Sequence, residues 1–500
     1  MGDQVRQRTY THADLRSYRS KLRRCLSTLG LMLDSGRFDD GELLTGVELE
    51  INLVDDAGRA SLKNAEVLAY LAESDAYSEV AVQPELGQFN LELNLDPRSI
   101  AGNGFSAYEQ DLRFMLHEVD ERARKTGSTL VLVGTLPTLR HADATEDSLS
   151  TNLRYRMLND SIIAARGDDI ELDIQGVERL RVYTDSIAPE AANTSVQFHI
   201  QTPPSQFAAY YNASQALAGA QLVVGANAPY LFDTRLWAET RIALFEQATD
   251  TRSRELKAQG VRPRVWFGER WAHSVLDLFE ENLRYFPPLL PESHAEDPFD
   301  VWRAGGVPKL TELRLHNGTV YRWNRPVYDV GANGLPHLRV ENRVLPAGPT
   351  VIDVLANMAF YMGAVRVLAE SDHPVWTRMP FGVAEQNLQA AARDGIAARQ
   401  WWPGLGEVDG VRLVDEVLLP LAHDGLDRFG VDPAERDRLL GVIEARCRTR
   451  VNGAAWQVAT VRHLEEKRSH NRTEALRGML KQYVRNAATQ APVHQWDAAA

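Results

Sequence analysis

Four short segments of the chain alternate strictly between apolar and polar residues, which is the pattern of half-buried β-strands. These segments are residues 46–53, 89–95, 196–201 and 338–344. Their polar positions hold side chains that bind metal ions or phosphate groups, and those side chains are Glu48, Glu50, Glu92, His199, Arg339, Glu341 and Arg343. Because successive side chains of a strand point to opposite faces, all of these groups can lie on one face of a sheet.

A sheet face of this kind would gather five carboxylates. They are Glu48, Glu50, Glu85, Glu92 and Glu341. Carboxylates a few ångströms apart raise one another's pKa unless positive charge lies between them. Two or three Mg²⁺ ions would supply that charge, and Mg²⁺ keeps coordination positions for water and nucleotide phosphates. Because histidine is an unusual ligand for Mg²⁺, His199 makes Mn²⁺ an acceptable substitute.

The arginines on the same face suit a phosphate group. Arg339 and Arg343 each lie two residues from Glu341, so the three side chains point the same way from a strand. A guanidinium in this position could hold a transferring γ-phosphoryl group, whose charge is spread over its oxygens.

An ordinary solvent-facing surface is the alternative interpretation, since antiparallel sheets often have one face in water. For any one of the four segments it is the more common explanation. The combination favours a binding site, because all four segments share the pattern and none of their polar faces contains a lysine.

These motifs resemble those of the glutamate–cysteine ligase family, in particular its second branch of bacterial carboxylate–amine ligases. The resemblance is carried by residues 46–50, 84–94 and 340–343 together with His199, and it spans roughly residues 40 to 370. The catalytic domain of this family is similar to that of glutamine synthetase, in which a curved antiparallel sheet holds ATP and two or three metal ions. The resemblance therefore implies the same fold and the same ligands here.

The resemblance also implies a role for each matching residue. The metal ligands that it implies are Glu50 and Glu92 for one ion, Glu48, His199 and Glu341 for a second, and Glu85 for a third. Arg343 would face the γ-phosphate, with Glu341 beside it as a catalytic residue, and Arg339 would also contact the nucleotide. Candidates to bind a substrate carboxylate or phosphate are Arg235, Arg241 and Arg252. Ordinary surface ion pairing is the alternative for these last three.

ATP-dependent amide formation is the activity implied by the resemblance. ATP would give its γ-phosphoryl group to a substrate carboxylate, and an amine would then displace phosphate from the acyl phosphate. The expected substrates are the γ-carboxylate of glutamate and the amine of cysteine. Alternatives that stay open are a ligase for another amine or amino acid, a phosphotransferase of the guanidino-kinase type, and a catalytically silent binding protein. The chain has no GxxxxGK[ST] phosphate-binding loop, which such chemistry does not need.

The composition narrows the class of protein further. With 500 residues, of which 44% are hydrophobic, the chain can bury a large core. A formal net charge of −13 disfavours nucleic acid as a partner. The two cysteines, Cys25 and Cys447, lie far apart without CxxC spacing, so neither a disulfide framework nor a thiolate zinc site is expected, and a reducing cytoplasm fits.

No membrane segment is expected either. The N-terminus lacks the apolar region of a secretory signal. The longest apolar stretch, residues 351–369, is interrupted by polar residues and is expected to be a buried helix that begins after Thr350. We therefore expect a cytoplasmic protein that acts on small molecules, while assembly into a homo-oligomer stays open.

The remaining pattern predicts an α+β fold, with helices flanking a curved, largely antiparallel sheet. Further strands are expected near residues 80–96, 129–134, 320–325 and 338–345, and helices across the first 30 residues and at 105–126 and 202–226. Residues 141–193 are expected to be irregular apart from a short helix at 153–165. We divide the chain into a catalytic domain, residues 1–370, and a mainly helical region, residues 371–500, packed on it.

Overall fold

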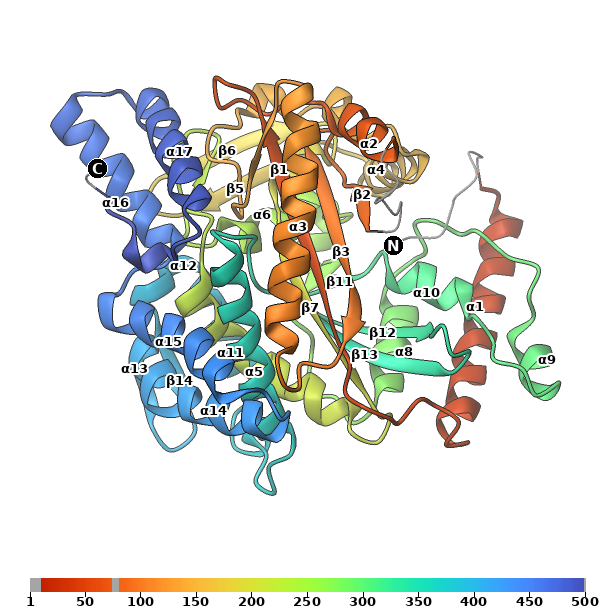
Figure 1. Ribbon diagram of the computed structural model, residues 1–500. Helices are drawn as coiled ribbons and strands as arrows, with labels where there is room; N and C mark the ends of the chain where they lie inside the picture. The colour runs from red at the N-terminus through yellow and green to blue at the C-terminus, as the bar shows by residue number, and fades with distance from the viewer. Residues whose placement is uncertain (1–9, 74–80, 499–500) are drawn as a thin grey trace.

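A seven-stranded antiparallel sheet forms the centre of the computed structural model, which describes residues 10–73 and 81–498 (Figure 1). The strand order is β12-β13-β7-β1-β3-β2, and β4 pairs with β1. The strands are β1 (Thr45–Val54), β2 (Val82–Pro84), β3 (Asn90–Arg98), β4 (Thr129–Val131), β7 (Val196–Thr202), β12 (Asn324–Val330) and β13 (Pro336–Asn342). The four alternating segments are thus four neighbouring strands, which confirms the predicted α+β fold with a curved antiparallel sheet.

The apolar side of these strands is buried under three helices. On β1, Val47, Leu49 and Ile51 are each at most 1% exposed. The covering helices are α3 (Gly104–Lys125), α5 (Phe207–Gly225) and α11 (Val351–Ala369). Phe198 of β7 stacks on Tyr361 of α11 with ring centroids 6.3 Å apart. Because this side is fully covered, the polar side of the sheet is the side available for ligands.

Helix α11 is long and apolar enough to cross a membrane, but its place in the fold explains its composition. In its most apolar window, 94% of the residues are buried inside the protein. It begins at the predicted residue, because the side chain of Thr350 accepts a hydrogen bond from the backbone N–H of Asp353. Neighbours on several sides, α5 and α14 (Leu419–Arg428) among them, cover α11, so it is a core helix.

The helices α11 and α14 approach each other closely because each has a glycine at their crossing. A Cβ atom built on Gly363 of α11 would lie 2.8 Å from the backbone of Ala422 in α14, a separation that real Cβ atoms essentially never show. A Cβ on Gly425 would in turn overlap the backbone of Gly363. The two helix backbones therefore touch, and no side chain can be added without moving one of them.

We expect Gly363→Ala to lower the free energy of unfolding by about 1–3 kcal/mol through overpacking, although alanine is the better helix former by about 1 kcal/mol. Gly441→Ala in α15 (Pro433–Thr449) is the matched control, because nothing lies within 4 Å of its Cβ position. Urea denaturation should show a gain in stability for the control and a loss for Gly363→Ala. Equal effects of the two changes would contradict this account of the helix crossing.

Four more helices belong to the C-terminal region, in cyan to blue in Figure 1. They are α12 (Phe381–Asp394), α15, α16 (Gly453–Arg468) and α17 (Arg472–Ala488). Helix α12 packs on α5, α15 packs on α11, and α16 and α17 pack on each other. Arg446 of α15 forms an ion pair of 2.7 Å with Asp353 of α11, and both side chains are at most 1% exposed. The same guanidinium donates to Asn357 at 2.6 Å. The C-terminal helices are thus joined to the core helix by buried polar contacts as well as by apolar packing.

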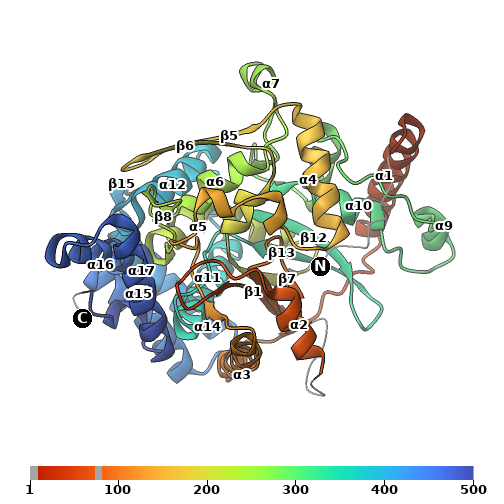
Figure 2. The ribbon, with the colours of Figure 1, turned by 90° about the horizontal axis from the view of Figure 1, so that it is seen from above.

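Helices α1 (His12–Leu33), α7 (Arg254–Ala258) and α9 (Pro298–Arg303) lie at the edges of the molecule (Figure 2). The other helices are α2 (Asn64–Ala72), α4 (Leu153–Arg166), α6 (Thr240–Ala248), α8 (Val275–Tyr285), α10 (Thr311–Asn317) and α13 (Gly410–Leu413). The helices predicted near the N-terminus, at 105–126, at 153–165 and at 202–226 are confirmed within a few residues.

One hairpin contradicts the prediction for its segment. Residues expected to be irregular contain β5 (Ile170–Gln175) and β6 (Arg179–Thr184), whose outer face holds charged pairs such as Glu171 with Arg181 at 2.8 Å. These charges masked the alternation of the two strands in the sequence. A second hairpin, β14 (Arg399–Trp402) and β15 (Gly406–Asp409), interrupts the mainly helical C-terminal region, and Gly404 in its turn has a φ of +83°.

Both cysteines are buried and unpaired. The thiol of Cys25 in α1 lies 3.7 Å from a carboxylate oxygen of Glu312 in α10. Burial, and then the charge of Glu312, raise the pKa of Cys25 to about 12. Burial likewise raises the pKa of Cys447 in α15 to about 12. Neither thiol is in a position to bind metal or to act as a nucleophile.

Candidate active site

The strand register places the predicted metal ligands opposite one another. Glu50 of β1 is paired with Glu92 of β3, and Glu48 lies on the same face of β1 two residues earlier. On the next strands, His199 of β7 is paired with Glu341 of β13. Paired residues of antiparallel strands have Cβ atoms about 4.5–5.5 Å apart. The acidic groups and the imidazole therefore form one continuous surface across four strands, which we call the polar face.

His199 joins two of these groups through its two ring nitrogens. Its Nε2 atom lies 3.2 Å from Oε1 of Glu48, and its Nδ1 atom accepts a hydrogen bond of 3.2 Å from Nε of Arg339. Because a guanidinium only donates, Nδ1 must accept and the ring proton lies on Nε2, facing Glu48. Burial acts to raise the pKa of Glu48, but the attraction of His199 and Arg339 outweighs it and holds that pKa well below its usual range.

Glu341 lies between two arginines. Its carboxylate is 2.8 Å from Arg325 of β12 and 3.3 Å from Arg343, and its exposed fraction is 2%. Burial acts to raise the pKa of Glu341, while Arg325 and Arg343 lower it further than burial raises it. Burial acts to lower the pKa of Arg343, but the negative charges of Glu341 and then Glu50 outweigh burial and raise that pKa. The negative charge of Glu341, at the β13 end of the polar face, is therefore already balanced by arginines of the protein.

Glu50 is held by hydrogen bonds rather than by a paired cation. Its oxygens accept from the backbone N–H of Ser195 at 2.6 Å, from the hydroxyl of the same residue at 3.0 Å, and from the amide of Gln197 at 3.0 Å. Burial raises the pKa of Glu50 despite these donors and despite the charges of Arg343 and Arg241.

The other end of the polar face carries uncompensated negative charge. Burial, and then the charge of Glu48, raise the pKa of Glu92 to about 7. Burial and repulsion from Glu92 and Glu50 raise the pKa of Glu85 well above its usual value. A sixth carboxylate, Glu190, lies close to this group, and burial together with repulsion from Glu50 raises its pKa to about 8. Near neutral pH these carboxyl groups compete for protons unless a cation is bound.

The sequence does not single out Glu190, because it lies in a short 3-10 turn (Ala188–Ala192) and not in an alternating strand. Tyr155 of α4 is a second residue without a signal in the sequence. Its hydroxyl donates to the carbonyl oxygen of Pro84 at 3.3 Å, and burial, then Glu85, raise its pKa well above the usual value. Both residues come from segments outside the sheet that fold over its polar face, so only their tertiary position could reveal them.

A cavity of about 470 Å³ opens at the edge of the polar face. It is lined by Glu48, His199 and Arg339 from the sheet and by the β12–β13 turn, residues 331–333. Small-molecule sites commonly have volumes of 300–1,000 Å³, so there is room for a ligand beside these charged groups.

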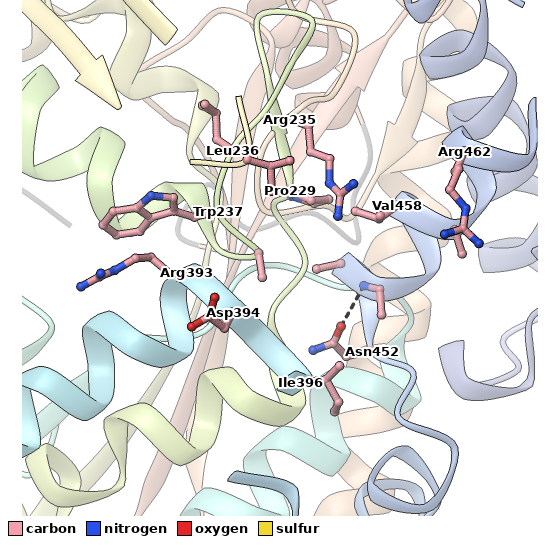
Figure 3. A pocket seen from close by; sticks show the side chains of 15 residues that line it. Pro229, Arg235, Leu236, Trp237, Arg393, Asp394, Ile396, Asn452, Val458 and Arg462 are labelled. Atoms are coloured by element: carbon pink, nitrogen blue, oxygen red, sulfur yellow. Dashed lines mark hydrogen bonds between the residues drawn. The ribbon is translucent and has the colours of Figure 1, made fainter. Parts of the chain in front are cut away.

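The arginines predicted outside the sheet lie in three different places. Arg241 of α6 is near the polar face: it is buried, and its guanidinium donates to the carbonyl oxygens of residues 343–345 at 3.2–3.3 Å. Arg252 lies in the loop before α7 and pairs with Asp250 at 2.9 Å. Arg235, in β9 (Thr234–Arg235), lines a separate cavity (Figure 3). The structure thus does not bring Arg235 and Arg252 to the polar face.

The donors on the polar face are of the right kind for Mg²⁺ or Mn²⁺, namely carboxylate oxygens and one imidazole. The raised pKa values of Glu92 and Glu85 show that this region favours an added positive charge, whether a proton or a metal ion. Across residues 10–73 and 81–498, no three acidic or histidine side chains converge as a ready-made metal cage. Metal binding would therefore require movements of these side chains that bring their donor atoms together.

A sheet of this topology with acidic, imidazole and guanidinium groups on one face defines an enzyme of the carboxylate–amine ligase type. Residues 44–460 match the model of glutamate–cysteine ligase family 2, and the chain belongs to that family. The match confirms the predicted resemblance and extends it beyond residue 370 into α16. The predicted ligase class is confirmed with it.

A solved ligase structure shows the same fold. A glutamate–cysteine ligase from Francisella tularensis, solved in complex with AMP, superposes with a TM-score of 0.54 over 92% of this chain and 91% of that chain, at 12% identity. A bifunctional glutathione synthetase from Pasteurella multocida has a TM-score of 0.47 over 93% of this chain and 55% of that chain, at 14% identity. A comparison with curated protein sequences finds no match.

We predict that Glu92→Gln stabilises the metal-free protein in a pH-dependent way. The folded-state pKa of Glu92, about 7, exceeds the unfolded value near 4.3, so wild-type stability is lost as pH rises from about 4 to about 7. Glutamine avoids this loss, so the stability difference should grow from near zero at pH 4 to about 2–3 kcal/mol at pH 8.

Urea denaturation in the presence of a chelator, at several pH values, measures this difference. Glu444→Gln is the control, because that carboxylate is exposed in α15. A constant difference across the pH range, or equal behaviour of the two variants, would show that Glu92 does not titrate as the buried environment requires.

Proposed function

We propose that the protein joins the γ-carboxylate of glutamate to the amine of cysteine, using ATP and forming an acyl phosphate. The observation that carries the proposal is the polar face itself, on which acidic groups and His199 lie on paired neighbouring strands beside the half-buried Arg343. Membership of glutamate–cysteine ligase family 2 supports these substrates, and the AMP named in the Francisella tularensis structure supports an adenine nucleotide as co-substrate. The family favours this reaction over a guanidino kinase or a silent binding protein.

Divalent cations are part of the proposal. Bound Mg²⁺ or Mn²⁺ would neutralise the phosphates and polarise the bond to the transferred group. The residues that would hold them are Glu48, Glu50, Glu85, Glu92, His199 and Glu341. Glu341 pairs with both Arg325 and Arg343, and a ligand oxygen would replace one of these carboxylate–guanidinium contacts as it binds.

In the first step, an oxygen of the substrate γ-carboxylate attacks the γ-phosphorus of ATP and ADP leaves. Arg343 and Arg339 would hold the transferring group, because guanidinium donors match the oxygens over which its charge is spread. Arg241 keeps the backbone of residues 343–345 in place through its three hydrogen bonds. The protein thus contributes positioning and charge stabilisation rather than a covalent group.

In the second step, the amine attacks the acyl carbon, the bond from that carbon to the phosphate oxygen breaks, and inorganic phosphate leaves. The attacking ammonium group must first lose a proton. Glu190, whose pKa is raised to about 8, is mostly protonated at pH 7, and its ionised fraction would accept this proton. Two buried and reduced cysteines and a net charge of −13 fit a cytoplasmic enzyme of small molecules.

The acyl phosphate can be tested with glutamate labelled with ¹⁸O in its γ-carboxylate. Incubation with ATP, Mg²⁺ and cysteine should give ADP, a dipeptide and phosphate that carries one ¹⁸O atom, measured by mass spectrometry. Phosphate release should require both the acid and the amine. Transfer to a guanidine compound would support a kinase instead, and formation of amide without labelled phosphate would exclude the acyl phosphate.

Glu50→Gln should reduce kcat about 100-fold or more, the scale expected when one charged group that stabilises the transition state is lost. Both oxygens of Glu50 accept hydrogen bonds, so the amide NH2 of the variant would face a donor and the melting temperature should fall; kcat is therefore measured well below that temperature. Glu444→Gln serves again as the control for an exposed charge. Wild-type turnover by Glu50→Gln would show that this carboxylate does not bind a metal ion.

A further inference from the structure

A second cavity, of about 420 Å³, lies among segments that are not part of the seven-stranded sheet (Figure 3). Its walls come from residues 229–238 around the hairpin of β8 (Tyr230–Leu231) and β9, from the C-terminal end of α12 and from the N-terminal half of α16. Pro229, Ile396 and Val458 give it an apolar lining. Its volume and this lining are those of a site for a small molecule.

Positive charge predominates among the ionised groups of this cavity. Three arginines line it, Arg235, Arg393 and Arg462, against one carboxylate, Asp394. Arg393 lies 5.5 Å from the centre of the Trp237 ring, and Arg462 is exposed on the surface of α16. The cavity therefore favours an anion.

Arg235 is the cation best placed to bind that anion. Its backbone N–H donates to Glu178 at 2.6 Å, but its guanidinium forms no hydrogen bond or ion pair with any residue of the described chain. Figure 3 shows this guanidinium directed across the cavity toward Val458. The charge of Glu178 acts on this half-buried guanidinium, but its five N–H donors stay unused beside an apolar wall.

The wall beside Arg235 is connected to the segment that carries Arg343. Ala238 donates to the carbonyl oxygen of Arg393 at 3.0 Å, and the next residue, Glu239, is completely buried. Glu239 pairs with Arg241 at 3.3 Å. Arg241 in turn holds the carbonyl oxygens of residues 343–345. A shift of the cavity wall would therefore move the group that positions Arg343.

A second connection starts from α16. Gln457, next to Val458 of the cavity, donates to the side-chain oxygen of Asn227 at 2.8 Å. The amide of Asn227 then donates to the carbonyl oxygen of Ala347 at 2.9 Å. Two chains of polar contacts thus lead from opposite walls of this cavity to residues 343–347, and the backbone N–H of Asn227 joins them by donating to Glu239 at 2.9 Å.

We propose that this cavity is a regulatory site for a small organic anion with an apolar body, which Arg235 binds through its carboxylate, phosphate or sulfonate group. Occupancy fixes the two walls relative to each other and restrains residues 343–347 through Glu239–Arg241 and Gln457–Asn227. Binding to the cavity stands independently of the ligase reaction, and only its regulatory consequence rests on the proposed function.

Binding of an organic anion in the cavity is tested with 8-anilinonaphthalene-1-sulfonate, a fluorescent probe that combines an aromatic body with an anionic group. The intact chain should bind one equivalent. Arg235→Gln should weaken binding about tenfold or more, since a charge-assisted contact is lost, and Ala455→Trp should abolish it by filling the cavity. Arg399→Gln, which removes an equal charge from the exposed β14, should leave the affinity unchanged.

Circular dichroism and the melting temperature establish that each variant is folded. Competition with octanoate and with hexyl phosphate then distinguishes a carboxylate from a phosphate ligand. Equal affinity of the wild type, Arg235→Gln and Ala455→Trp for the probe would place the probe elsewhere and overturn the proposal.

The proposed effect of the bound anion on residues 343–347 is tested by hydrogen exchange, which does not depend on turnover. The N–H groups of Arg343 and Ala347 donate to Trp323 and Thr194, and a saturating amount of the probe should slow their exchange several-fold. The effect should be lost in Arg235→Gln at the same probe concentration. Unchanged exchange with the cavity occupied would overturn the regulatory role, whatever the outcome of the ligase assay.

Discussion

The repulsion between buried carboxylates on one sheet face is the constraint around which the rest of the molecule is arranged. Antiparallel pairing places Glu50 beside Glu92, and the fold cannot move them apart without breaking the register. The protein compensates in part, with two arginines at Glu341 and with backbone and side-chain donors at Glu50. The part left uncompensated, around Glu92 and Glu85, is where cations and phosphates are expected to bind.

Repulsion between the acidic groups lowers the stability of the folded protein, and apolar packing on the opposite face of the sheet offsets this loss. The alternation that places acids on one side of β1 places Val47, Leu49 and Ile51 on the other, where α3, α5 and α11 cover them. The buried contact of Gly363 with α14 and the ion pair of Arg446 with Asp353 fix the C-terminal helices around α11. A rigid core of this kind allows charged groups to be held at short distances even though they repel.

The alternating strands could be predicted because their period of two residues is a local property of the sequence. The same holds for α11, whose first residue is set by the Thr350 cap. Glu190 and Tyr155 could not be predicted, because loops outside the sheet bring them to the polar face. The positions of Arg235 and Arg252 could not be predicted either, since arginine spacing does not reveal whether a loop folds toward the sheet or away from it. The β5–β6 hairpin was obscured by charges that pair only across strands.

The high pKa of the two buried thiols affects how the protein reacts with oxidised small thiols in its surroundings. With a pKa of about 12, only roughly one thiol in 10⁵ is ionised at pH 7 at Cys25 or Cys447. Mixed disulfides form by attack of a thiolate, so both side chains are inert toward cystine and other oxidised small thiols. A protein that handles free cysteine would thereby escape covalent inactivation by the oxidation products of its own substrate.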